Sequence, residues 1–243
     1  MSVGQTRLVF EEIDRRPTPM GDISLRRRFI PTIEVEVYEV ILGDEHLMSS
    51  LFTVAEIALA DLGLAALEGP GPLDVVVGGL GLGYTAGAAL ADERVGSLWV
   101  VDALPDVIRW HEEGVLALSP ALADDARCRL VHGDFFAMVA DGSPFGPDAP
   151  EQVHAVLLDV DHTPRHVLHP SHAPFYEPDG LRRLRQRLHP GGVFALWSDT
   201  APDRAFVTAV GEVFGNCEVH DVPFPNPHTG GEGRNAVVVA VAD

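Results

Sequence analysis

Cysteine is scarce in this chain, and long apolar runs are absent. The 243 residues include 2 cysteines, Cys128 and Cys217, which stand far apart and outside any CxxC pair. This scarcity argues against a disulfide framework and against a thiolate zinc site. No apolar stretch reaches the ~18–20 residues that a membrane-spanning helix needs, and the first residues lack the basic-then-apolar layout of a secretory signal. We therefore expect a soluble, cytoplasmic protein without a membrane partner.

Basic residues are also few. The chain has 17 Lys and Arg against 36 Asp and Glu, which gives a formal net charge of −19. A field of this sign repels phosphate backbones, so the composition argues against nucleic acid as a partner. A cationic small molecule would be attracted. The same charge also helps to keep a protein in solution, and this plainer explanation stays open.

The first 46 residues differ from the rest of the chain. Residues 33–40 alternate apolar and charged side chains, which is typical of a half-exposed strand. The short runs 8–10 and 23–25 are candidates to pair with it. We predict a small antiparallel β-element over residues 1–46 and a larger unit over residues 47–243. The larger unit begins with a helix predicted over 48–67, where apolar residues recur at a helical spacing.

Apolar strands alternate with helices from Leu73 onward. The expected strands cover residues 73–77, 97–101, 128–131, 154–158, 192–197, 217–222 and 236–241. The expected helices cover residues 84–91, 104–118, 135–140, 178–188 and 202–214. Near-continuous apolar strands between helices are typical of a parallel sheet covered on both faces. We predict an α/β, Rossmann-like fold with a mainly parallel seven-stranded sheet whose last strand is antiparallel.

A glycine-rich turn follows the first of these strands. Gly79, Gly81 and Gly83 allow the backbone to bend tightly and a ligand to approach closely. Their spacing fits a turn that binds adenosylmethionine, whereas the spacing from Gly81 to Ala86 fits the dinucleotide fingerprint equally well. The turn therefore predicts a nucleotide-like cofactor without naming it.

Carboxylates follow the next two strands. Asp102, with Ala103 after it, ends the second strand, where a carboxylate accepts hydrogen bonds from ribose hydroxyls. Gly133, Asp134 and Phe135 follow the third strand, where the carboxylate suits an adenine amine and the ring suits the base. Dinucleotide folds do not generally need an aspartate there, so the pattern favours adenosylmethionine over NAD. The plainer alternatives are a strand-end turn for Asp102 and a helix N-cap for Asp134.

Asp159 and Asp161 stand at the end of the fourth strand, beside the expected place of the cofactor's reactive carbon. A carboxylate there can hold an ammonium group, and it can take a proton so that an amine becomes nucleophilic. Pro164 favours an early turn, which lets one carboxylate face the cofactor and the other the substrate. We predict both as catalytic residues, and a turn or cap is the plainer alternative.

Together these motifs carry a family resemblance over roughly residues 34–241. The ordered set resembles the class I adenosylmethionine-dependent transferases and, among them, the spermidine synthase family, which transfers an aminopropyl group from decarboxylated adenosylmethionine to a diamine. Further matching stretches are residues 164–176, 188–192 and 222–225. The resemblance implies S-adenosylmethionine or decarboxylated S-adenosylmethionine as cofactor. It also implies Asp159 as the catalytic, cofactor-contacting aspartate, Asp102 as the ribose ligand and Asp134 as the adenine ligand.

The chain departs from that family at three places. The family's turn carries an aspartate that binds the aminopropyl end, whereas residues 78–83 contain no carboxylate. The family's Asp-x-x-Asp is here Asp159-x-Asp161, and Glu56 alone is kept from its Tyr-His-Glu. These departures leave open whether an aminopropyl or a methyl group is transferred. A non-catalytic adenosylmethionine-binding protein and an NAD-dependent oxidoreductase remain as alternatives.

Several further residues are expected to contact a small amine substrate. Four histidines lie within residues 162–172, and we interpret this segment as a substrate lid and not as a metal site, because prolines break any helix and no cysteine joins the set. Surface histidines on a long loop are the plainer alternative. His162 in this segment, together with Glu56, Tyr176 and Phe224, is assigned to the substrate. Packing is the alternative for Tyr176. The amino-terminal β-element is expected to pair across a homodimer.

Overall fold

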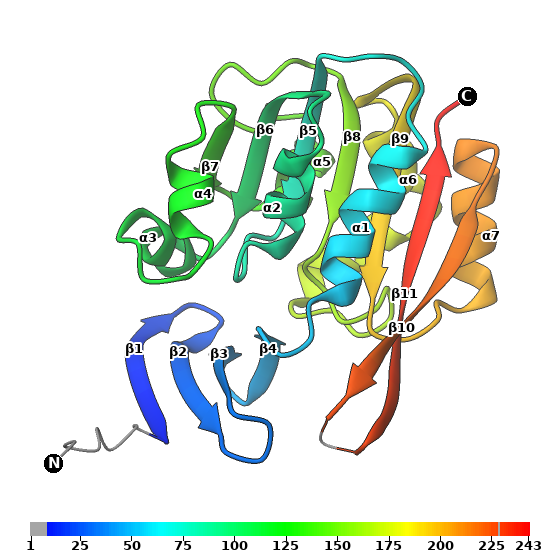
Figure 1. Cartoon of the computed structure of the whole chain (residues 1–243). Coiled ribbons are helices and arrows are strands. Elements are labelled where there is room, and N and C mark those ends of the chain that lie inside the picture. Colours follow the sequence, from blue (N-terminus) through cyan, green and yellow to red (C-terminus); the bar gives the residue numbers. More distant parts are fainter. Residues whose placement is uncertain (1–8, 228) are drawn as a thin grey trace, which may run out of the picture.

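Two β-sheets make up the frame of the protein (Figure 1). The computed structural model describes residues 9–227 and 229–243, so Leu8 of the expected first strand lies outside the described residues. The smaller sheet is antiparallel, and its strands follow one another in chain order. They are β1 (Phe10–Thr18), β2 (Gly21–Ile30), β3 (Val35–Leu42) and β4 (Glu45–Ser49). The predicted small β-element is present, with one more strand than expected.

The larger sheet has seven strands in the order β10-β11-β9-β8-β5-β6-β7. They are β5 (Leu73–Gly78), β6 (Val95–Asp102), β7 (Cys128–His132), β8 (Val153–Leu158), β9 (Leu188–Ser198), β10 (Glu218–Asn226) and β11 (Gly231–Val241). The pairs among β5 to β9 are parallel, whereas β11 pairs antiparallel with both β9 and β10. This topology confirms the predicted fold class, including the antiparallel last strand.

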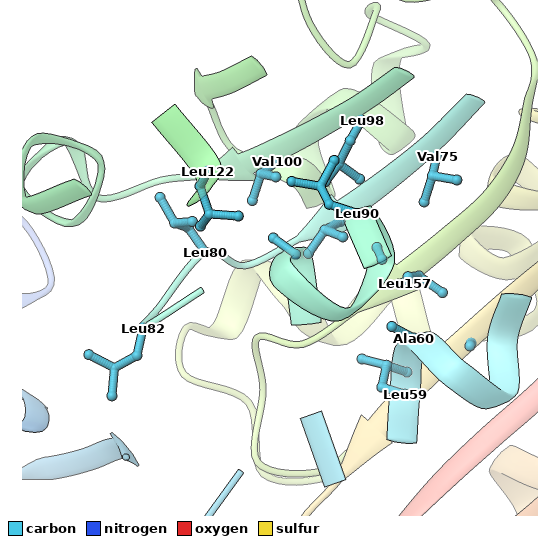
Figure 2. Packing of buried hydrophobic residues seen from close by; sticks show 14 of the residues in the cluster. Leu59, Ala60, Val75, Leu80, Leu82, Leu90, Leu98, Val100, Leu122 and Leu157 are labelled. Carbon is cyan, nitrogen blue, oxygen red and sulfur yellow. The ribbon is translucent and has the colours of Figure 1, made fainter. Parts of the chain in front are cut away.

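Helices cover both faces of the larger sheet (Figure 1). They are α1 (Val54–Ala65), α2 (Tyr84–Ala91), α3 (Pro105–Glu112), α4 (Ser119–Ala123), α5 (Phe135–Asp141), α6 (Pro178–Arg185) and α7 (Arg204–Phe214), with a 3-10 helix η1 at Pro170–Tyr176. Among the described residues, no helix has the length and apolarity that crossing a membrane requires. Because strand side chains alternate, Val75 packs in one core with α1 and α2, and Val76 packs in a second core with α5, α6 and α7. Figure 2 shows the first core, where Val75 and Leu157 face the helices.

The predicted helices over residues 48–67 and 104–118 are shorter than expected. Residues Glu45–Ser49 form β4, which pairs with β3, and α1 begins after Thr53. Periodicity within the sequence does not reveal the partner strand that holds this stretch extended. Within residues 104–118, α3 ends at Glu112, because Gly114 adopts a φ of +71°. The separate helix α4 begins at Ser119.

The last two strands are longer than expected. Residues 223–235, predicted as a loop, are mostly strand, since β10 runs to Asn226 and β11 starts at Gly231. Pro223 and Pro225 are compatible with a strand because β10 is the edge of the sheet, where alternate backbone positions need no N–H donor.

Polar contacts from β1 and β4 tie the small sheet to the larger unit. Asp14 of β1 accepts a hydrogen bond from Trp110 Nε1 at 2.8 Å and forms an ion pair with Arg109, both on α3. Met48 of β4 accepts a hydrogen bond from the Leu82 N–H through its sulfur at 2.9 Å. The small sheet is thereby held over the carboxyl ends of the parallel strands (Figure 1).

Candidate functional site

A cavity lies between the two sheets, at the carboxyl ends of β5, β6 and β8. It encloses about 1050 Å³, including its open mouth. Its polar lining residues are Glu56, Tyr84, Asp102, Asp134, Asp159, His162, His172 and Trp197. β5 stands between β6 and β8, so the strand order changes direction there. Open α/β sheets bind ligands at such a switch point, which makes this cavity the candidate site.

The glycine turn after β5 needs its glycines for packing. Gly79, Gly81 and Gly83 adopt φ values of +95°, +47° and +90°, which L-residues with a side chain rarely adopt. A Cβ on Gly79 would lie 2.0 Å from the carbonyl oxygen of Asp159, and one on Gly83 would lie 2.7 Å from Leu122. The predicted positions therefore form the turn, and Gly79 and Gly81 line the cavity.

The backbone donors of this turn are already engaged. Gly79 N–H donates to Val101 O at 2.9 Å, and Leu80 N–H donates to Asp102 Oδ2 at 2.9 Å. Leu82 N–H donates to Met48 Sδ at 2.9 Å, and Gly83 N–H donates to Leu80 O at 2.8 Å. A pyrophosphate-binding turn instead offers free N–H groups to its ligand. The first-turn N–H groups of α2 have no partner among the described residues, so the turn does not decide between the two cofactor classes that the sequence left open.

Asp102 sits beside this turn and keeps capacity for a ligand. Its second oxygen, Oδ1, accepts from the Leu104 N–H at 2.8 Å. Burial raises the pKa of Asp102, and the backbone hydrogen bonds oppose that effect. Each carboxylate oxygen has two lone pairs, so acceptor sites remain for hydroxyl groups. Ala103 also lines the cavity.

Asp134 is both a helix cap and a cavity residue. Its Oδ1 accepts a hydrogen bond from the Ala137 N–H at 3.1 Å at the start of α5. Asp134 is therefore the helix N-cap that the sequence analysis gave as an alternative. The side chain is exposed and lines the cavity together with Gly133 and Phe135. Phe135 is 3% exposed and stacks on Phe145 with ring centroids 5.7 Å apart, so it supplies a rigid apolar surface there.

Asp159 and Glu56 form a carboxyl pair in the cavity. Thr85 donates its hydroxyl to Asp159 Oδ2 at 2.7 Å, which orients that carboxylate. Burial raises the pKa of Asp159 to about 6. Burial and repulsion from Asp159 raise the pKa of Glu56 to about 8. The two carboxyl groups therefore titrate as a pair and share about one proton at neutral pH.

Asp161 does not line the cavity, which corrects its predicted role as a catalytic residue. The side chain is fully buried and accepts from Leu168 N–H at 2.7 Å, from His172 Nδ1 at 2.9 Å and from Tyr176 OH at 2.7 Å. Tyr176 is 5% exposed and does not line the described cavity. This position agrees with the packing role that the sequence analysis gave as the alternative to substrate contact. Asp161 instead orients His172, which lines the cavity and stacks on Phe136 at 3.9 Å.

The remaining predicted substrate residues lie in different places. His162 lines the cavity, and its buried Nε2 lies 3.5 Å from Glu45 Oε2 without forming a hydrogen bond to any described residue. Phe224 packs on Phe52 with centroids 5.4 Å apart and does not line the described cavity, so the prediction that it contacts the substrate is not met there. Among the described residues, no three His, Cys, Asp or Glu side chains are arranged to hold a metal ion.

The cavity is acidic. Four carboxyl groups line it, from Glu56, Asp102, Asp134 and Asp159, whereas no arginine of the described chain does so. The sequence contains no lysine. Low-dielectric walls with charge of one sign concentrate ligands of the opposite sign. The cavity therefore suits a cationic ligand that carries hydroxyl groups.

Comparison with known proteins identifies the fold. No protein-family model and no curated protein matches this chain. A spermidine synthase solved in complex with the transition state analogue AdoDATO aligns with a TM-score of 0.72 at 14% identity, over 96% of this chain and 74% of that chain. The chain has the fold of the spermidine synthases. Spermidine synthase from Thermotoga maritima gives a TM-score of 0.71 at 14% identity, over 96% and 73% of the two chains.

A methyltransferase also shares part of this fold. Human methyltransferase-like protein 13, in complex with SAH, aligns with a TM-score of 0.55 at 18% identity, over 78% of this chain and 82% of that chain. The spermidine synthase likeness is closer and covers nearly the whole chain. It confirms, at the level of the fold, the resemblance that the motifs predicted.

Three contacts of the site were not expected from the sequence. Thr85 bonds Asp159 across 74 residues, Met48 bonds Leu82 across 34, and His172 is held by Asp161. Thr85 is a polar residue in the first turn of the helix after the glycine turn, a position that offered some signal. Nothing in the local sequence marks Met48 or the pairing of Asp161 with His172.

Proposed function

We propose that this protein is a transferase that alkylates a small amine with an adenosyl sulfonium compound. The observation that carries the proposal is the acidic cavity at the switch point, beside the glycine turn. The carboxyl groups of the lining suit a phosphate-free, cationic nucleoside and repel the pyrophosphate of a dinucleotide. Shared fold with the spermidine synthases supports the same class.

The adenosine half would be held at one end of the cavity. Asp102 would accept hydrogen bonds from the ribose hydroxyls, and Asp134 would accept from the adenine amine. Phe135 would support the base. Gly79 and Gly81 line the cavity, and their backbone would lie against the sulfonium chain. The free acceptor sites on Asp102 and the exposure of Asp134 support these roles.

Charge favours the decarboxylated form of the cofactor. An intact amino-acid end brings a carboxylate, which would need a cation or free N–H groups. No arginine of the described chain lines the cavity to meet that need. The decarboxylated sulfonium carries positive charge alone and matches the acidic lining. We therefore propose aminopropyl transfer over methyl transfer.

Asp159 would act as the general base. The bound sulfonium supplies an electrophilic carbon: the amine nitrogen bonds to it as the carbon–sulfur bond breaks, and the electron pair stays on the departing thioether sulfur. Asp159 takes the proton that the amine must lose, and Thr85 holds the carboxylate in place for it. A base whose pKa lies near 6 is mostly ionised at neutral pH and still accepts a proton effectively.

Calorimetric titration of the purified protein tests the proposal. The ligands are adenosylmethionine, its decarboxylated form, methylthioadenosine and NAD. We expect the decarboxylated form and methylthioadenosine to bind at least tenfold more tightly than adenosylmethionine, with no detectable heat from NAD. Tighter binding of adenosylmethionine would point to a methyltransferase, and tighter binding of NAD would overturn the proposed class. Binding without turnover of any amine would favour a non-catalytic protein.

A further inference from the structure

The small sheet closes the cavity with apolar side chains. In the described part of that sheet, every residue that lines the cavity is apolar: Met20 in the β1–β2 turn, Val40 and Leu42 on β3, and Leu47 and Met48 on β4. We call these five residues the apolar wall. The carboxyl groups of the cavity come from the opposite side, from α1 and from the ends of the parallel strands. A ligand in the cavity therefore meets an acidic face and an apolar face.

A β-bulge builds this wall. Val40 pairs with Met48 and Ile41 pairs with His46, so Leu47 is an extra residue on β4. In a regular strand, neighbouring residues point to opposite faces. The bulge removes that alternation locally, and Leu47 and Met48 both line the cavity. The backbone irregularity thus places a second apolar side chain at the site.

The bulged strand passes close to the carboxyl pair. At one end, Met48 sulfur lies on the Leu82 N–H of the glycine turn. At the other end, Glu45 lies 3.5 Å from His162, which follows Asp159 closely in the chain. In the chain, Leu47 lies between the residues that make these two contacts. The wall therefore faces the part of the cavity where the proposed transfer takes place, and not the adenosine end alone.

The lining leaves one anionic site for an acceptor amine. Asp102 and Asp134 belong to the adenosine half, where both already accept backbone hydrogen bonds. Glu56 and Asp159 remain, and the raised pKa of Glu56 leaves about one negative charge on the pair at neutral pH. The terminal ammonium group of the decarboxylated cofactor also needs this site, so the acceptor nitrogen enters it as the neutral amine that reacts. A second ammonium group on the acceptor would lie against the apolar wall without a partner. Burying an unpaired charge is strongly unfavourable.

We propose that the acceptor is a monoamine with an apolar carbon skeleton, which lies along the apolar wall with its nitrogen at the Glu56–Asp159 pair. This inference rests on the proposed function and names the substrate class of the same site. It departs from the diamine that the family resemblance implies. The amine end meets carboxyl oxygens, and the hydrocarbon end gains from burial against Leu47, Met48 and their neighbours.

Two amines of equal size provide the test. 1-Aminopentane and 1,4-diaminobutane have the same number of heavy atoms and differ by a terminal methyl in place of a terminal ammonium group. Both are titrated by calorimetry into the protein saturated with methylthioadenosine. We expect 1-aminopentane to bind about tenfold or more tightly, because the methyl group is buried without a charge. Equal or tighter binding of the diamine, or binding of neither amine, overturns the proposal.

The first titration, with methylthioadenosine alone, separates the two hypotheses. If methylthioadenosine binds and the diamine is preferred, the acceptor class is wrong and the proposed function stands. If methylthioadenosine does not bind, the proposed function fails, and the two amines are compared on the free protein. A preference for 1-aminopentane there still supports the apolar wall, and its absence refutes it.

Variants of the wall give the converse result. Leu47→Glu places a carboxylate on the wall, and we expect the preference to shift at least tenfold toward the diamine. Met20→Glu tests the same idea at a half-buried turn residue, so it guards against misfolding of the first variant. Val35→Glu is the matched control, because Val35 lies on β3 of the same sheet, is 40% exposed and does not line the described cavity. A shift in the control equal to that in Leu47→Glu would attribute the effect to net charge and would sink the proposal.

Discussion

The buried carboxyl of Glu56 makes the stability of this protein depend on pH, and Glu56→Gln tests that statement. Burial, followed by repulsion from Asp159, raises the pKa of Glu56 from 4.5 to about 8. The folded protein thus binds this proton more tightly than the unfolded chain does. The resulting stabilisation is complete below pH ~4.5 and is lost as pH rises through ~8. The pKa difference corresponds to roughly 5 kcal/mol, and because Asp159 shares in the effect we expect about 2 to 5 kcal/mol.

The side chain of glutamine has nearly the same size as that of glutamate and does not ionise. At pH 5 the variant and the natural protein should therefore have similar free energies of unfolding. At pH 8 the variant should be more stable by about 2 kcal/mol or more. Urea unfolding at pH 5, 6.5 and 8 measures this difference, with Glu68→Gln at an exposed position as control. Parallel pH profiles for the natural protein and Glu56→Gln would refute the reasoning.

Three further substitutions probe other parts of the site. Asp159→Asn should leave the dissociation constant of methylthioadenosine within about tenfold and lower turnover by ~10²-fold or more, and natural turnover should rise as pH passes through about 6. Unchanged turnover in that variant would remove Asp159 as the base. Gly79→Ala should destabilise the protein by at least about 2 kcal/mol more than Gly43→Ala. Both glycines have a positive φ, but a Cβ on Gly43 would meet open space, whereas a Cβ on Gly79 would meet the carbonyl of Asp159. Equal losses of stability in urea unfolding would contradict this clash. Asp161→Asn should lower stability by about 1–3 kcal/mol and weaken methylthioadenosine binding by freeing His172. Full affinity in a destabilised variant would limit Asp161 to a structural role.

Local patterns in the sequence predicted the sheet and the glycine turn well. The apolar strands and the turn depend on residues that are neighbours in the chain, so Leu73–Gly78 and Tyr84–Ala91 lie almost where the periodicity indicated. β4 was missed because its extended form depends on pairing with β3, and its bulge depends on the register of that pair. Residues 45–49 alone indicate neither the pairing with β3 nor its register.

The two strand-end aspartates show the same limit within the site. Two residues apart, Asp159 and Asp161 would share a face if the strand continued, and the chain instead leaves β8 at Leu158. Asp159 consequently faces the cavity, whereas Asp161 is enclosed by Leu168, His172 and Tyr176. The sequence predicted that the two side chains diverge. It did not contain the long-range contacts that decide which of them is buried.

The internally bonded glycine turn bears on how this protein's relatives can be interpreted. Gly79 and Gly83 are required by packing, and Asp102 satisfies backbone donors, so all three would be retained in a descendant that had lost its ligand. Retention of these three residues in a relative would therefore show that the fold is kept, and would not by itself show catalysis. Glu56 differs, because a buried carboxyl beside another one lowers stability at neutral pH. A relative that keeps Glu56 despite this loss of stability is expected to use it, whereas a relative that keeps only the fold is free to lose it.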